Sequence, residues 1–233
     1  MPLKSVTKLM VACITLLSLT ACGNDPQARR GADTVKELAV LAKSRLLGEK
    51  PEQVEAADPV AMIDYALRAA PDAPLQFILM EKSGGFAVST VQGINGQNVT
   101  WISPDKKSIT LKVGLLAATR GFGGDVMSIE QGGADRLVSG RRSGQVQKTY
   151  RFLNGLDQTG RFIVTCDVAA GATDHVSSGE ISAPTRVMTE TCKSEGGTEF
   201  TNTYWVDASG RMVQSIQWAG PDVGKIVFRQ LRF

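Results

Sequence analysis

The sequence predicts a mainly β protein, an antiparallel barrel or half-barrel preceded by two short helices. Three observations support this prediction: segments in which apolar and polar residues alternate, turn-forming residues between those segments, and helical spacing confined to the first third of the chain. The alternation is clearest in residues 109–115, where Ile, Leu, Val and Leu alternate with Thr, Lys and Gly. A period of two residues indicates strands with one buried face.

The two predicted helices each begin with a capping signal. Thr34 and Glu37 form a capping-box pattern, in which both side chains satisfy free backbone N–H groups. Apolar residues then recur at helical spacing until a glycine and a proline end the segment. The second helix begins at Asp58, an N-cap residue followed by Pro59 at the first helical position, and ends at Pro71.

The remaining chain predicts roughly nine or ten strands joined by short turns. Asn95-Gly96 is a hairpin signal, and residues 207–210 contain a glycine suited to positive φ. We expect the sheet to curl into a barrel, because closure removes exposed edges, with the helices at one end or across the mouth. The predicted strands cover residues 77–80, 86–92, 98–102, 109–115, 149–152, 162–168, 200–206, 212–218 and 225–233.

The first 21 residues have the pattern of a signal peptide. Lys4 and Lys8 precede the apolar run Leu9–Leu19, which is shorter than the ~20 residues that a membrane-spanning helix needs. The tetrapeptide that ends at Cys22 resembles the lipobox of bacterial lipoproteins. We therefore expect cleavage before Cys22 and attachment to a membrane through lipid on that cysteine.

The domain organisation follows from this start. Residues 1–21 are the predicted signal peptide, residues 22–33 a polar tether, and residues 34–233 a single β-rich domain. Loss of Lys4 and Lys8 lowers the formal net charge from +3 to +1. A nearly neutral chain lacks the basic footprint of a nucleic-acid-binding protein, so no nucleic-acid partner is expected.

Two cysteines are left in the predicted mature domain, Cys166 and Cys192. In an exported chain such a pair favours a disulfide, whose loop closure would stabilise the fold by about 3.5 kcal/mol. Two free buried thiols and a metal site are the alternatives. Metal binding is disfavoured, because His175 is the only histidine and no CxxC motif exists.

A search for catalytic motifs finds none, and we predict that the chain is not an enzyme and carries no cofactor. Nucleophile elbows, HExxH and Walker loops are absent from the sequence. His175 follows Asp174 in a polar stretch, residues 171–180, which we interpret as a solvated loop. A glycan-active enzyme would need two carboxylates at a fixed separation, and nothing pairs any two of Asp167, Asp174, Glu180 and Glu190.

Three residues are candidates for a binding surface. Strand alternation puts Trp205 on the face opposite Tyr204, so Trp205 is the aromatic residue that we expect to face solvent or a partner. Arg120 and Phe122 lie in a glycine-rich segment and form a second candidate patch. The structural alternative is that the aromatic residues fill the barrel and the glycines permit a tight turn.

Three stretches stand out by their order and spacing: Gly114–Asp125, Asn202–Asp207 and Gln214–Pro221, with the lipobox before them and the two cysteines between the first and the second. Together these features resemble the YjbF/GfcB family of group 4 capsule polysaccharide lipoproteins. The resemblance implies a mainly β, barrel-like outer-membrane lipoprotein that faces the periplasm and takes part in producing or exporting capsule or exopolysaccharide. It implies no catalytic residues.

These observations leave three candidate functions. The leading one is a non-catalytic accessory of exopolysaccharide secretion that holds the polymer or an export protein. The second is a half-barrel carrier of an apolar ligand, similar to the lipoprotein-sorting receptors, which would need a cavity of several hundred cubic ångströms. The third and least favoured is a glycan-active enzyme.

Overall fold

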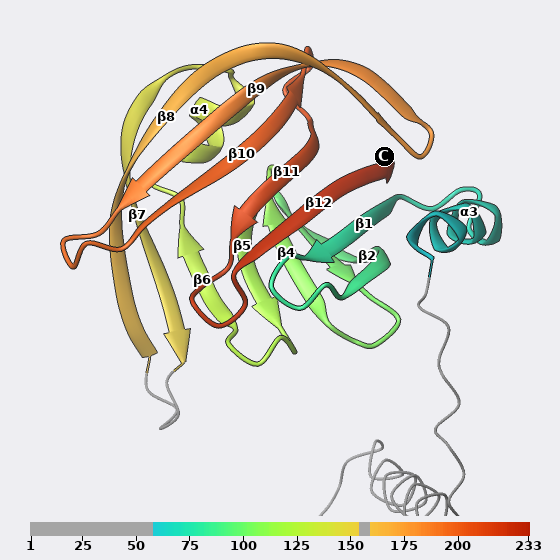
Figure 1. Cartoon of the computed structure of the whole chain (residues 1–233), viewed down its shortest axis with the longest axis horizontal. Helices are drawn as coiled ribbons and strands as arrows, with labels where there is room; N and C mark the ends of the chain where they lie inside the picture. The colour runs from blue at the N-terminus through green and yellow to red at the C-terminus, as the bar shows by residue number, and fades with distance from the viewer. Residues whose placement is uncertain (1–57, 154–158) are drawn as a thin grey trace, which may run out of the picture. The chain divides into compact units, whose positions relative to one another are not determined.

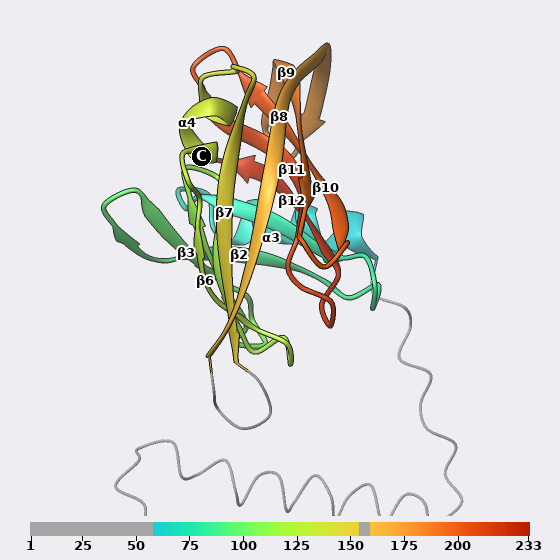
Figure 2. The same ribbon diagram turned by 90° about the vertical axis from the view of Figure 1, so that its left-hand side faces the viewer.

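The computed structural model describes residues 58–153 and 159–233. In these residues twelve strands form one sheet, in the order β5-β4-β3-β2-β1-β12-β11-β10-β9-β8-β7-β6. All recorded strand pairs are antiparallel. The sheet curls into a nearly closed barrel, as Figure 1 and Figure 2 show from two directions. The predicted fold class is confirmed.

The elements have the following bounds: α3 Pro59–Ala69, β1 Leu75–Met80, β2 Phe86–Asn95, β3 Asn98–Ile102, β4 Ser108–Lys112, β5 Leu115–Arg120, β6 Val126–Glu130, α4 Ala134–Ser139, β7 Gly144–Leu153, β8 Thr159–Ser178, β9 Ile181–Lys193, β10 Glu199–Asp207, β11 Met212–Trp218 and β12 Lys225–Arg232. Strands that follow one another in sequence pair with one another, with one exception. The sheet begins at β5 and ends at β6, and no ladder joins these two strands. Pairing of β1 with β12 brings the two ends of the described chain together.

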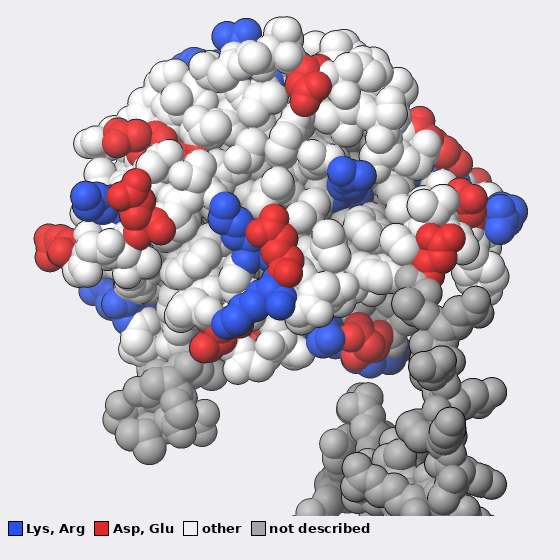
Figure 3. All heavy atoms as spheres, in the orientation of Figure 1, with Lys and Arg blue, Asp and Glu red and all other residues white. Residues whose placement is uncertain are grey.

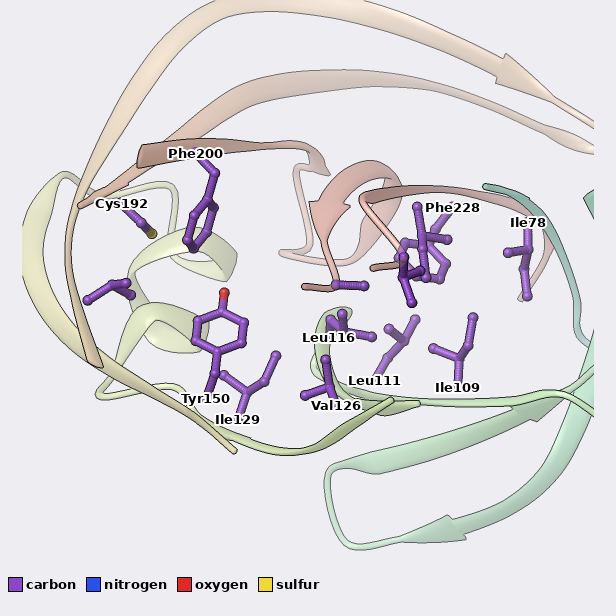
Figure 4. Close-up of a cluster of buried hydrophobic side chains, with 14 of the residues drawn as sticks. Ile78, Ile109, Leu111, Leu116, Val126, Ile129, Tyr150, Cys192, Phe200 and Phe228 are labelled. Carbon is purple, nitrogen blue, oxygen red and sulfur yellow. The ribbon is translucent and has the colours of Figure 1, made fainter. Parts of the chain in front are cut away.

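The barrel interior is filled by apolar side chains from most of the strands. Figure 4 shows the rings of Tyr150 and Phe200 pointing toward one another near Cys192, with Leu116, Val126 and other aliphatic side chains beside them. Tyr150, 1% exposed, lies perpendicular to Phe200 with 5.9 Å between ring centroids. Burial of such side chains is the main force that holds the barrel closed.

The predicted helix at Asp58 is confirmed as α3. The Asp58 side chain accepts a hydrogen bond from the Val60 amide at 2.9 Å, as an N-cap should. The position of α3 differs from the prediction. The helix lies on the outer face of the sheet rather than at an end or across the mouth of the barrel. Its apolar side chains pack on those of β1, β2 and β12, including Leu75 and Phe77.

A second helix, α4, was missed by the sequence analysis. It has six residues, too few for the 3.6-residue period to repeat convincingly. Ala134 and Val138 are fully buried and pack with Met188, Tyr204 and Val206. The helix therefore contributes to the core at one end of the barrel.

The prediction of one strand over residues 109–115 was wrong, because the chain turns back at Val113-Gly114 between β4 and β5. Both residues have positive φ, +51° and +83°, as a tight two-residue hairpin requires. Val113 is β-branched, and β-branched residues rarely adopt positive φ, so the alternating pattern predicted a continuous strand through this turn. In contrast, the hairpin predicted at Asn95-Gly96 is confirmed between β2 and β3.

Residues 171–180 were also predicted wrongly as a loop. They form the far half of the hairpin between the long strands β8 and β9, in which His175 pairs with Pro184. This part of the hairpin is largely exposed, so its outward and inward residues are both polar and the apolar alternation is lost. The strands β6 and β9 as a whole were missed as well. A register shift between Val126 and Ser128 interrupts the period of two in the five residues of β6, and β9 buries the polar residues Thr185 and Glu190.

The predicted signal peptide, the tether and the helix that begins at Thr34 lie outside the described residues. Within the part of the chain that the structure covers, neither helix is long and apolar enough to cross a membrane.

Candidate functional site

The two ends of the barrel carry different connections. Because neighbouring strands are antiparallel, alternate connections lie at the same end. The β2–β3, β4–β5 and β10–β11 turns share one end with α4, which we call the α4 end. The β5–β6, β9–β10 and β11–β12 turns lie at the opposite end, which we call the aromatic end because rings from several strands gather there.

The aromatic end contains an open hollow of about 270 Å³. Three half-buried aromatic side chains contribute to its wall, Phe152 from β7, Phe162 from β8 and Trp218 from β11. Trp218 is held from below by Phe200, whose ring stacks on it with 4.2 Å between centroids. The hollow is lined by Gly124, Phe152, Phe162, Thr198, Trp218, Pro221 and Asp222.

A second cavity, of about 390 Å³, lies at the α4 end. Its lining is mostly apolar and includes Trp101, Leu111 and Phe228, while Gln76 and Gln230 border it with buried amide groups. The Gln76 Nε2 atom donates to Gln230 Oε1 at 3.2 Å. This volume falls in the range of small-molecule sites.

Arg120 and Phe122, the predicted patch, lie at the seam between β5 and β6. Side chains there replace the missing ladder: Val126 N donates to Thr119 Oγ1 at 3.0 Å, and Arg120 Nη1 donates to Val126 O at 3.0 Å. Asp125 accepts hydrogen bonds from the Gly121 and Phe122 amides and orders the turn. The structure therefore gives this segment a role in closing the barrel.

Trp205 lies half-buried on the face opposite the buried Tyr204, as strand alternation predicted. Its indole Nε1 donates to Asp174 Oδ2 at 2.8 Å, across from β10 to β8. This hydrogen bond lowers the pKa of Asp174 from its ordinary value, with a further contribution from the His175 amide. Trp205 and the seam residues belong to different parts of the barrel.

A buried ion pair lies in the core, a feature that sequence reasoning missed. Lys148 Nζ is 3.0 Å from Glu190 Oε2, which also accepts hydrogen bonds from Asn202 Nδ2 and the Tyr204 hydroxyl, both at 2.7 Å. Burial alone would raise the pKa of Glu190, but the ammonium group and the two donors outweigh burial and lower it. Burial likewise opposes the charge on Lys148, but Tyr150 and Glu190 raise its pKa.

The four carboxylates considered for glycan hydrolysis are in separate contacts. Asp167 accepts from Gln145, Asp174 from Trp205, and Glu180 pairs with Arg232, whereas Glu190 is sealed in the core. The structure does not bring the four together around a common cleft among the described residues.

The predicted disulfide between Cys166 and Cys192 is confirmed, and both residues are fully buried. These sulfurs and Glu190 form a group with metal-ligand spacing in the described residues. Sulfurs joined in a disulfide are not thiolates, so the group does not offer the ligands of a metal site.

Charge is mixed on the face of the molecule shown in Figure 3, where Lys and Arg side chains lie beside Asp and Glu. Such a face offers no broad basic surface for a polyanion.

Comparison with models of known protein families identifies the family of this chain. A model described as "Group 4 capsule polysaccharide lipoprotein gfcB, YjbF" matches residues 41–231. The chain belongs to this family. All three YjbF-like stretches lie within the matched range, so the resemblance predicted from them is confirmed.

Comparison with solved structures finds the same fold in a lipoprotein from Escherichia coli. The hypothetical lipoprotein YmcC from Escherichia coli K12 is similar with a TM-score of 0.63 and 16% identity, over 78% of this chain and 98% of that chain. An exported protein with a YmcC-like fold from Bacteroides fragilis has a TM-score of 0.34 and 10% identity, over 69% and 93% of the two chains. Comparison with the curated proteins gives no match.

The YjbF-family stretches meet at the aromatic end. Gly124 from the first stretch lies against Asp222, one residue past the third, and Trp218 of the third stretch donates its backbone N–H to Asn202 Oδ1 of the second at 2.7 Å. Sequence reasoning missed Phe152, Phe162 and Asp222 as site residues. No local signal marks them, because the hollow is formed by residues of three strands and three turns that lie far apart in the chain.

Proposed function

We propose that this YjbF-family chain is a non-catalytic accessory in the production or export of capsule or exopolysaccharide. The family match over residues 41–231 is the observation that carries the proposal. A barrel without an assembled catalytic constellation among its described residues fits a protein that binds and holds. The partner is the polysaccharide or a protein that exports it.

The proposal includes the location of the chain. Residues 1–21 direct export, Cys22 receives lipid, and the barrel faces the periplasm from the outer membrane. The sequence pattern at Cys22 and the lipoprotein family support this location. Two or more acyl chains hold a protein stably on a membrane.

The test is a gene deletion followed by measurement of extracellular polysaccharide. Complementation uses the wild-type chain, Cys22→Ala, and a chain with an ordinary cleavable signal peptide that delivers the barrel to the periplasm without lipid. Loss of polymer on deletion, restored by the wild type alone, is the expected result. Unchanged polymer after deletion would overturn the proposal, and full rescue by the unlipidated periplasmic chain would overturn the need for the anchor.

A carrier of an apolar ligand is the second candidate function, and the cavity at the α4 end favours it. Its volume of about 390 Å³ meets the requirement set out for such a carrier. Titration with a fluorescent fatty acid tests it, using Leu111→Gln to place a polar side chain in the lining. Saturable binding that the variant weakens would support a carrier, whereas an absence of binding would remove this candidate.

A further inference from the structure

The hollow at the aromatic end combines two kinds of surface. Its floor is formed by the rings of Phe152, Phe162 and Trp218, and its rim carries the exposed side chains of Thr198 and Asp222. The Asp222 carboxylate has no ion pair or hydrogen bond with another residue that the structure describes. The rings offer an apolar surface, and the carboxylate and the hydroxyl above them offer hydrogen bonds, so a ligand must match both.

We propose that this hollow binds a single neutral sugar ring of a polysaccharide. A pyranose ring has a face of C–H groups, which packs on the negative face of an aromatic ring, and a perimeter of hydroxyl groups. Those hydroxyls donate to the Asp222 carboxylate and exchange hydrogen bonds with Thr198. The volume of about 270 Å³ lies just below the usual range for ligand sites, which suits one ring of a chain that continues into solvent.

The Asp222 carboxylate favours a neutral sugar over an acyl chain or an acidic sugar. An acyl chain would cover Asp222 without giving it a hydrogen bond, and burial of an unpaired carboxylate is costly. An acidic sugar would be repelled by it. A neutral ring satisfies the carboxylate and covers the aromatic floor at the same time.

The rim is held in place before any ligand arrives. Lys82 Nζ donates to the carbonyls of Pro221 and Asp222 at 3.2 and 3.0 Å, and Gly224 N donates to Gly220 O at 2.8 Å within the same turn. Gly124 presses against this turn so closely that a Cβ atom there would lie 2.4 Å from Asp222 Cβ. A preformed turn lowers the entropic cost of binding.

The three tryptophans of the chain allow a site-specific test. Trp101 lines the cavity at the α4 end, Trp205 lies on the outer face, and Trp218 lines the hollow. The lipidated chain, labelled with fluorotryptophan and placed in lipid nanodiscs, is titrated with oligosaccharides from mild acid hydrolysis of the host's secreted polysaccharide. Fluorine NMR should show saturable shifts of the Trp218 signal, with the Trp101 and Trp205 signals unchanged.

Matched variants test the rim. Asp222→Asn removes the charged acceptor, and the affinity should fall about tenfold, as for loss of a hydrogen bond to a charged group. Glu195→Gln removes an exposed carboxylate from the β9–β10 turn at the same end, outside the hollow, and should bind like the wild type. The Trp205 signal confirms that each variant is folded.

The inference rests on the proposed function for its choice of polysaccharide, but the sugar site and the proposed function can fail independently of one another. Oligosaccharides that leave Trp218 unchanged, or that shift Trp101 or Trp205 instead, overturn the sugar site even if deletion abolishes polymer. Equal affinity of Asp222→Asn and Glu195→Gln also overturns it. Unchanged polymer after deletion would overturn the proposed function and would leave a measured Trp218 shift standing.

Discussion

Lys148 and Glu190 face one another inside the barrel, with Nζ 3.0 Å from Oε2 and the two side chains 2% and 0% exposed. They come from β7 and β9, with β8 between them, and are 42 residues apart in the chain. Removal of one partner from a buried pair leaves the other charged group without compensation, so substitution of either residue is strongly destabilising.

The first prediction concerns this pair. Glu190→Gln should lower the free energy of unfolding by about 3–5 kcal/mol, because it leaves the Lys148 ammonium buried without a counter-charge. Urea denaturation measures the change. The control is Glu130→Gln, which breaks the surface pair with Arg151 and should cost less than about 1 kcal/mol. Equal losses in the two variants would show that the core pair is not sealed from water.

The second prediction is the pH dependence that follows from Glu190. Its pKa in the folded protein is below the ordinary value of 4.5, so its contribution to stability is present above that pH. The contribution is lost as pH falls below about 4.5 toward the lowered folded pKa. Urea midpoints of the wild type and Glu190→Gln, measured from neutral pH to about pH 3, should therefore converge in acid. A constant gap between them would contradict the pKa shift.

The third prediction concerns the disulfide. Cys166→Ala with Cys192→Ala should cost about 3.5 kcal/mol, since the bond closes a loop between residues 26 apart and so restricts the unfolded chain. Because both cysteines are 0% exposed, a reductant should act on the wild type only when denaturant is also present. Intact mass gives the readout, and a gain of two hydrogens under native conditions would contradict this expectation.

The fourth prediction concerns the seam between β5 and β6. Thr119→Val should lower stability by about 1–3 kcal/mol, because it leaves the buried Val126 N–H without its acceptor. Hydrogen exchange at the Val126 amide should accelerate. Thr110→Val is the control, since it removes only a side-chain contact with Thr100 from the ladder of β3 and β4. Unchanged exchange at Val126 would mean that the backbones close the seam unaided.

The fifth prediction concerns Trp205. Trp205→Ala should unfold near the wild-type temperature, because the ring lies half-buried on the outer face, yet should reduce polysaccharide secretion in the complementation assay. Trp205→Phe keeps an aromatic ring and removes the hydrogen bond to Asp174, so it separates the contribution of the ring from that of the hydrogen bond. A large drop in the melting temperature of Trp205→Ala would instead make the residue part of the folded framework.

The local pattern of residues determined a good part of the fold. Alternation of apolar and polar side chains predicted most strands and the opposite faces of Tyr204 and Trp205. Capping residues predicted the start of α3, and the two leftover cysteines predicted their own bond. Each of these signals involves residues that are close in sequence or chemically unique, so it can be recognised without the tertiary structure.

Only the tertiary structure decided where the barrel closes and what it places together. Pairing of β1 with β12, the side-chain seam at β5 and β6, the ion pair of Lys148 with Glu190 and the hollow around Trp218 all join distant segments. From the sequence, a lysine or a glutamate is expected on the surface, because burial of its charge is tolerated only when the fold places an oppositely charged partner beside it. Sequence periodicity fixes which way a side chain points, whereas the curl of the whole sheet fixes what it meets.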